Sequence, residues 1–128
     1  MTGPSSNIFG QLLLEKLLQQ HQEHGRLIVA FDFDDTVSPY RYPMEVLLPI
    51  HDLLKECYQA GHELVCFTAN DNHEKVRAFL HEHEIQFHTI NQSSVPSKGK
   101  IFYNIFLEDK TGLDQTLEIL REFLRRTV

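Results

Sequence analysis

The chain has 128 residues and a net charge of -6 at pH 7, from 12 Lys and Arg against 18 Asp and Glu. Its length fits one domain, residues 1–128, because domains usually span about 100–200 residues. A hydrophobic fraction of 41% with 23% charged residues is typical of a globular protein and excludes a disordered or fibrous chain. The acidic charge disfavours nucleic acid as a partner, because phosphate groups are bound by basic surfaces.

The cysteines and the N-terminal residues bear on the compartment. Cys57 and Cys66 show neither a CxxC pattern nor a Cys/His spacing, so we expect reduced core residues. The sequence lacks a run of about 18 apolar residues, which a membrane helix needs, and its first residues lack the basic and apolar regions of a signal peptide. These patterns predict a cytoplasmic protein with no membrane insertion.

The first part of the chain predicts two helices around a buried strand. Apolar residues at helical spacing predict a helix from Ile8 to about His24. The apolar run 27–31 predicts a strand that is buried on both faces and ends at Asp32. A second helix is expected from Met44 to about Ala60, before Gly61.

The rest of the chain repeats this alternation. The apolar run 64–67 predicts a second strand that ends at Thr68, and Asn70 or Asp71 is expected to cap a helix. The remaining predicted elements are a third strand at 85–90, a fourth strand at 101–107 and a helix at 113–124. Alternating strands and helices predict an α/β fold, a three-layer Rossmann-like sandwich with a parallel central sheet covered on both faces.

Acidic side chains follow two of the predicted strands. Asp32, Asp34 and Asp35 end or follow the first strand, and Glu108 with Asp109 ends the fourth. In parallel sheets, ligands bind outside the carboxyl ends of the strands. Carboxylates that meet at such an edge repel one another unless a cation lies among them, and Mg²⁺ prefers oxygen ligands. The pattern therefore predicts a magnesium site, beside which a carboxylate can attack a phosphoryl group.

The segment 27–37 resembles the first motif of the haloacid dehalogenase superfamily of phosphohydrolases, a hydrophobic strand followed by Asp-x-Asp-x-Thr/Val. The strand, both aspartates and Thr36 agree with the motif, whereas Asp35 replaces the usual glycine. The resemblance implies that Asp32 is the nucleophile. It also implies that Asp34 is the general acid, with a backbone carbonyl that contacts the metal, and that Thr36 belongs to the phosphate-binding residues.

Two further motifs of the family concern phosphate binding. The strand ending at Thr68 resembles the second motif, and the backbone N–H groups of Ala69 and Asn70 are then placed to bind phosphate. The third motif is a lysine. Lys100, eight residues before the acidic pair, resembles the lysine of small family members, and Lys98 is the competing choice. The resemblance implies that Thr68 and the lysine hold the transferring phosphoryl group.

The fourth motif is an acidic pair at the end of a strand, which Glu108 and Asp109 match. The resemblance implies that Asp109 binds Mg²⁺ directly and that Glu108 is an outer partner of the ion or of the lysine. All four motifs occur in the expected order between about Leu27 and Gly112.

Larger family members carry a cap domain, for which this chain has no room. The segments 37–61 and 70–98 are too short, so the resemblance implies a minimal, capless member with a catalytic core at about 27–124. The helix at 8–24 is then an extension and a candidate dimerisation element. Arg41, in the loop after the first strand, is suited to a second anionic group of the substrate.

These observations predict a Mg²⁺-dependent phosphomonoesterase for a small metabolite, a sugar phosphate or nucleotide, with a nucleic-acid terminal phosphate as the alternative substrate. A receiver-like phosphoacceptor uses the same residue types, but in another order along the chain. A noncatalytic binding module of this fold usually lacks an aspartate of the first motif, and both Asp32 and Asp34 are present. The histidines at 21–24 and 81–83 lack a third metal ligand, so we expect them on solvated helix faces.

Overall fold

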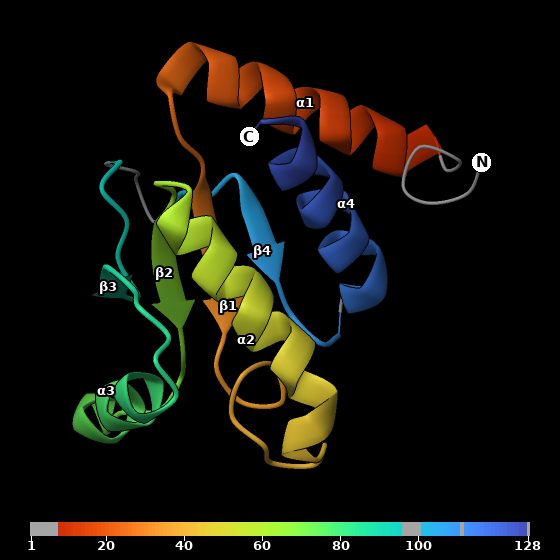
Figure 1. Cartoon of the computed structure of the whole chain (residues 1–128). Coiled ribbons are helices and arrows are strands. Elements are labelled where there is room, and N and C mark those ends of the chain that lie inside the picture. The colour runs from red at the N-terminus through yellow and green to blue at the C-terminus, as the bar shows by residue number, and fades with distance from the viewer. Residues whose placement is uncertain (1–7, 96–100, 111, 128) are drawn as a thin grey trace.

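The computed structural model describes residues 8–95, 101–110 and 112–127. Its strands are β1 (Ile28–Asp32), β2 (Glu63–Phe67), β3 (Thr89–Ile90) and β4 (Ile105–Leu107), and its helices are α1 (Ile8–His24), α2 (Met44–Gln59), α3 (His73–Glu82) and α4 (Leu113–Arg126) (Figure 1). The four strands are parallel and lie in the order β3-β2-β1-β4, which confirms the α/β class. None of the helices in these ranges is long and apolar enough to cross a membrane.

Two predicted strands are much shorter than expected. The predicted strand at 85–90 is only β3, because the N–H of Ile85 bonds to the carbonyl of Leu80, 2.8 Å away, in the turn that closes α3. The predicted strand at 101–107 is only β4. The N-cap of α3 is Asn72, whose side chain accepts from the N–H of Lys75, rather than Asn70 or Asp71.

The helices all pack on one face of the sheet. Each contributes to a single apolar cluster, for example Leu17 of α1, Leu54 of α2, Leu80 of α3 and Leu120 of α4. Figure 1 shows α2 and α4 in front of the sheet, with α1 across α4. The opposite face carries a second cluster made of strand residues: Ile28, Ala30, Val65, Phe67 and Phe106.

This arrangement differs from the expected three-layer sandwich. The described parts of the connection from β3 to β4, residues 91–95 and 101–104, contain no helix. In a parallel sheet, the connection that passes from one side of the central strand to the other is the one that could place a helix on the opposite face. Among the described residues the fold therefore has one helical layer.

Helix α1 is attached to the centre of the sheet. Leu14 and Leu17 are buried in the core. The Oε1 of Gln20 accepts from the Nδ2 of Asn104 at 3.0 Å, and the Oδ1 of Asn104 accepts from the N–H of Ile28 at 2.6 Å. A polar chain thus links α1 to the first residue of β1, so α1 is an integral part of this fold.

The strand order places the candidate site. From β1 the chain first adds β2 and β3 on one side, and then crosses to add β4 on the other side. The carboxyl end of β1 is therefore a topological switch point, the place where open α/β sheets bind ligands. Asp32 is the last residue of β1 and lies at that point.

Truncation of α1 residues tests its role. Leu17→Ala is expected to lower the free energy of unfolding by about 2–4 kcal/mol, because it leaves a cavity in the core. Leu12→Ala, on the same helix but 51% exposed, should change it by about 0.5 kcal/mol or less. Urea unfolding of the two variants measures the difference. Equal and small losses would show that α1 is dispensable for folding.

Candidate functional site

The register of the sheet brings two acidic segments to one edge. Phe31 of β1 pairs with Leu107 of β4, so Asp32 and Glu108 follow on adjacent strands, with Asp109 one residue further. The predicted convergence of acidic residues at the carboxyl edge is therefore seen in the structure.

The charges at this edge change the ionisation of Asp32. Burial raises its pKa, and a hydrogen bond from the backbone N–H of Phe33 opposes that effect. Three neighbouring carboxylates raise it further, in decreasing order Glu108, Asp109 and Asp34. The result is a pKa of about 6 for Asp32, against an ordinary value of 3.8. Carboxylates that repel one another in this way are a common feature of functional sites.

The oxygen donors at this edge fit Mg²⁺. Within the described ranges, no three His, Cys, Asp or Glu side chains are arranged as a metal site. Mg²⁺ keeps several waters and is usually held by one or two carboxylates, so it does not require three. Asp32 and Asp109 would supply carboxylates, and the family resemblance predicts that the backbone carbonyl of Asp34 is a further ligand. A cation would relieve the repulsion that raises the pKa of Asp32.

Asp35 holds the loop that follows β1. Its Oδ1 accepts from three successive backbone N–H groups, those of Tyr40 at 3.1 Å, Arg41 at 2.6 Å and Tyr42 at 3.1 Å. Burial would raise the pKa of Asp35, but these bonds and the charge of Arg41 lower it below its ordinary value. Its φ of 59° lies in the left-handed region, which glycine and Asp tolerate best. Asp35, which stands where the resembling motif has a glycine, therefore has a structural role.

The same loop exposes Asp34 and buries Thr36. The carbonyl of Phe33 accepts from the N–H groups of Val37 and Ser38 at 3.1 and 3.0 Å, which closes a tight turn. Asp34 lies exposed on this turn. Thr36 is completely buried, and its Oγ1 has no partner among the described residues. With its side chain buried, Thr36 could contact a phosphate only through its backbone, and its place among the phosphate-binding residues stays a prediction.

Thr68 is fixed by a residue that the sequence analysis did not identify. The N–H of Thr68 donates to the Oδ1 of Asn91, and the Nδ2 of Asn91 donates to the carbonyl of Thr68, both at 2.9 Å. The Oγ1 of Thr68 accepts from the N–H of Asn70 at 3.0 Å, so that N–H is not directed at phosphate as predicted. The N–H of Ala69 has no acceptor within the described ranges and stays a candidate. A polar residue directly after a strand was the only signal for Asn91.

The remaining residues considered in the sequence analysis are two cysteines, two lysines and an arginine. Cys57 and Cys66 are free and buried, as expected, and burial raises the pKa of each thiol to about 12. Lys98 and Lys100 lie outside the described residues. The guanidinium of Arg41 lies 5.9 Å from the ring centroid of Tyr40 and is exposed to solvent.

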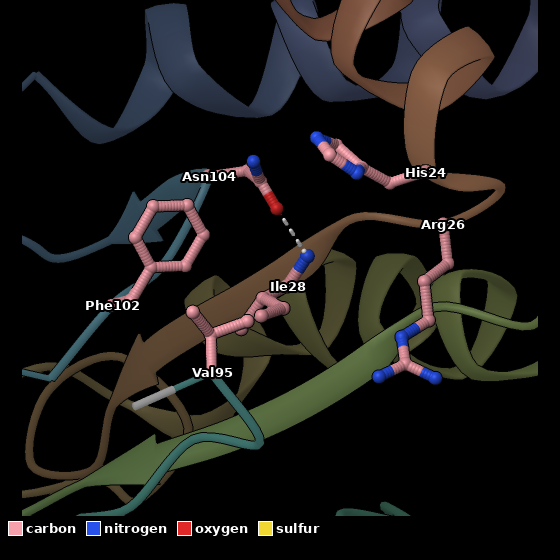
Figure 2. Close-up of a pocket in the computed structure, with 6 residues that line it drawn as sticks. All are labelled: His24, Arg26, Ile28, Val95, Phe102 and Asn104. Atoms are coloured by element: carbon pink, nitrogen blue, oxygen red, sulfur yellow. Dashed lines mark hydrogen bonds between the residues drawn. The ribbon is translucent and has the colours of Figure 1, made fainter. Parts of the chain in front are cut away.

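A cavity of about 440 Å³ lies at the opposite, amino edge of the sheet (Figure 2). Its described lining residues are His24, Arg26, Ile28, Val95, Phe102 and Asn104. Arg26 extends towards β2, where it pairs with Glu63 at 3.1 Å, and Asn104 bonds to the backbone of Ile28. The described lining has no carboxylate. This cavity is therefore separate from the acidic edge.

Comparisons of the chain with protein-family models, with curated proteins and with solved structures find no match. The family resemblance and the function accordingly stay predictions. They depend on the motifs and on the geometry of the acidic edge, where Asp32, Asp34, Glu108 and Asp109 interact.

Asp32→Asn is expected to raise the free energy of unfolding of the metal-free protein at about pH 7.5. At about pH 4 the same substitution should change it very little. Because the folded-state pKa of Asp32 is raised to about 6, its stability contribution is complete below 3.8 and is lost as the pH rises through about 6. Asparagine removes that loss, which amounts to about 1–2 kcal/mol for a partly solvated group. Urea unfolding with a chelator at both pH values measures it.

Asp52→Asn, on the exposed side of α2, is the matched control and should show little change at either pH. The same stabilisation by Asp32→Asn at both pH values would contradict the electrostatic explanation.

Proposed function

We propose that the protein is a Mg²⁺-dependent phosphomonoester hydrolase that forms an aspartyl-phosphate on Asp32. The observation that carries this proposal is the set of four interacting carboxylates at the switch point of the sheet. The match of the first motif to the haloacid dehalogenase superfamily supports it. The physiological substrate class that fits best is a small phosphorylated metabolite.

The first step is a phosphoryl transfer to the protein. A carboxylate oxygen of Asp32 forms a bond to phosphorus while the bond from phosphorus to the leaving oxygen breaks. Asp34, exposed two residues further along the chain, gives its proton to the leaving oxygen. The Oγ1 of Thr68 accepts from the N–H of Asn70, and its own proton is available to a phosphoryl oxygen.

The second step releases phosphate. The carboxylate of Asp34 takes a proton from a water molecule as the water oxygen bonds to phosphorus. The bond between phosphorus and the carboxylate oxygen of Asp32 then breaks, and both aspartates return to their starting state. When bound, Mg²⁺ would neutralise part of the negative charge of Asp32, Asp109 and the phosphoryl oxygens.

Phosphate release from a panel of sugar phosphates, nucleotides and an aryl phosphate tests the proposal. We expect release with Mg²⁺ and none with chelator. Asp32→Asn should lower kcat by about 10³-fold or more, since it removes the nucleophile. Asp34→Asn should slow turnover and let the aspartyl-phosphate accumulate, whereas Asp52→Asn should keep full activity. A long-lived aspartyl-phosphate in the unaltered protein would instead favour the phosphoacceptor, and no reaction from folded, Mg²⁺-binding protein would favour a binding module.

Mg²⁺ titration calorimetry can distinguish the roles of the two acidic residues that follow β4. Asp109→Asn is expected to weaken Mg²⁺ binding by about 10–100-fold, because it removes a carboxylate ligand, and Glu108→Gln by less, as an outer partner. The reverse order of the two variants would assign the direct ligand to Glu108.

A further inference from the structure

A second cavity, of about 390 Å³, opens at the acidic edge between the first turns of α2 and α4. Its floor is formed by the buried side chains of Leu47, Ile50 and Leu117. Its rim carries Tyr42 and Val46, which are 44% and 57% exposed. Its volume is within the range of small-molecule sites.

The cavity and the candidate nucleophile share one residue. Asp109 lines the cavity, and its negative charge also acts on Asp32. Asp35, three residues after Asp32, lines the cavity as well. A phosphoryl group bound at Asp32 would therefore be near Asp109, the residue that lines the cavity and also acts on Asp32.

The charge of the cavity restricts what it can bind. The charged residues of its described lining are Asp35, Asp109 and Asp114, all acidic. Arg41, which the sequence analysis selected for a second anionic group, is absent from this lining, and its guanidinium lies by the ring of Tyr40 instead. A second phosphate or carboxylate in the cavity would be repelled mainly by Asp114, because the charge of Asp35 is already stabilised by three backbone N–H groups and that of Asp109 would be shared with Mg²⁺.

We propose, on the basis of the hydrolase activity above, that this cavity binds the leaving group of the substrate and selects an uncharged, partly apolar group. An aromatic ring or a nucleoside fits the volume and the apolar floor. The leaving group packs against Val46 and the aliphatic side chains of α2 and α4. Esters with a second anionic group in the leaving part are poor substrates, because the acidic lining repels them.

The predicted binding of a large leaving group in the cavity is tested by comparing naphthyl phosphate with acetyl phosphate in the presence of Mg²⁺. Val46→Trp, which fills the cavity, is expected to lower kcat/KM for naphthyl phosphate by about tenfold or more and to change that for acetyl phosphate by less than about threefold. Leu48→Trp also introduces a tryptophan on α2, at a 46% exposed residue outside the described lining, and should leave the ratio of kcat/KM for the two substrates unchanged.

The charge of the leaving group is tested with phenyl phosphate and its carboxy-substituted analogue. The unaltered protein should prefer phenyl phosphate by about tenfold or more. Asp114→Lys should narrow this preference, since it places a cation in the lining. Glu118→Lys makes the same change of charge one turn further along α4, at an exposed residue outside the described lining, and should not narrow it.

The outcomes separate the two proposals. Hydrolysis of acetyl phosphate with ratios that neither Val46→Trp nor Asp114→Lys alters overturns the role of the cavity and leaves the hydrolase in place. Equal effects of the lining variants and their controls overturn it too. Absence of phosphate release from every substrate overturns both proposals.

Discussion

Repulsion among carboxylates at the end of β1 is the constraint around which this structure is arranged. The parallel register of β1 and β4 leaves Asp32 beside Glu108 and Asp109, and burial, together with these negative charges, raises the pKa of Asp32 to about 6. Apolar burial on the helical face of the sheet offsets that cost, with Phe31 and Leu107 fully buried directly before the acidic residues. The acidic edge is thus held together by the core that precedes it in both strands.

Neighbouring aspartates on the same turn have opposite pKa shifts, and hydrogen-bond donors explain the difference. Asp35 receives three backbone N–H groups, which stabilise its charge, so that its pKa falls. Asp32 receives only one such bond, so burial, and after it three negative neighbours, raise its pKa. The carboxylate of Asp35 therefore holds the loop 40–42. The carboxylate of Asp32 keeps a less stabilised negative charge, which can bind a cation or attack a phosphoryl group.

Sequence periodicity predicted the helices well, because amphipathic faces such as that of α4 are local properties of the chain. It predicted the acidic edge because strand ends are marked by abrupt changes from apolar to charged residues. It did not predict what depends on distant partners: the two hydrogen bonds of Asn91 to Thr68, or the packing of His21 against Phe123 at 5.3 Å and of His83 against His51 at 5.5 Å. His21 and His83 were expected on solvated faces and are half-buried. Their partners lie on other helices, where a periodic pattern gives no signal.

The single helical layer and the position of the site have a common origin in the chain connections. Helix α2, which connects β1 to β2, and helix α4, which follows β4, lie on the same face of the sheet, and their first turns meet at the carboxyl edge. Val46 of α2 and Leu113 of α4 therefore face the same space as Asp109, although they are far apart in the sequence. An apolar wall beside a cluster of carboxylates is costly for a surface that binds nothing, since it leaves Val46 and Tyr42 exposed to water. The arrangement suits a ligand with one charged end and one uncharged end, because each end then meets the chemistry that stabilises it.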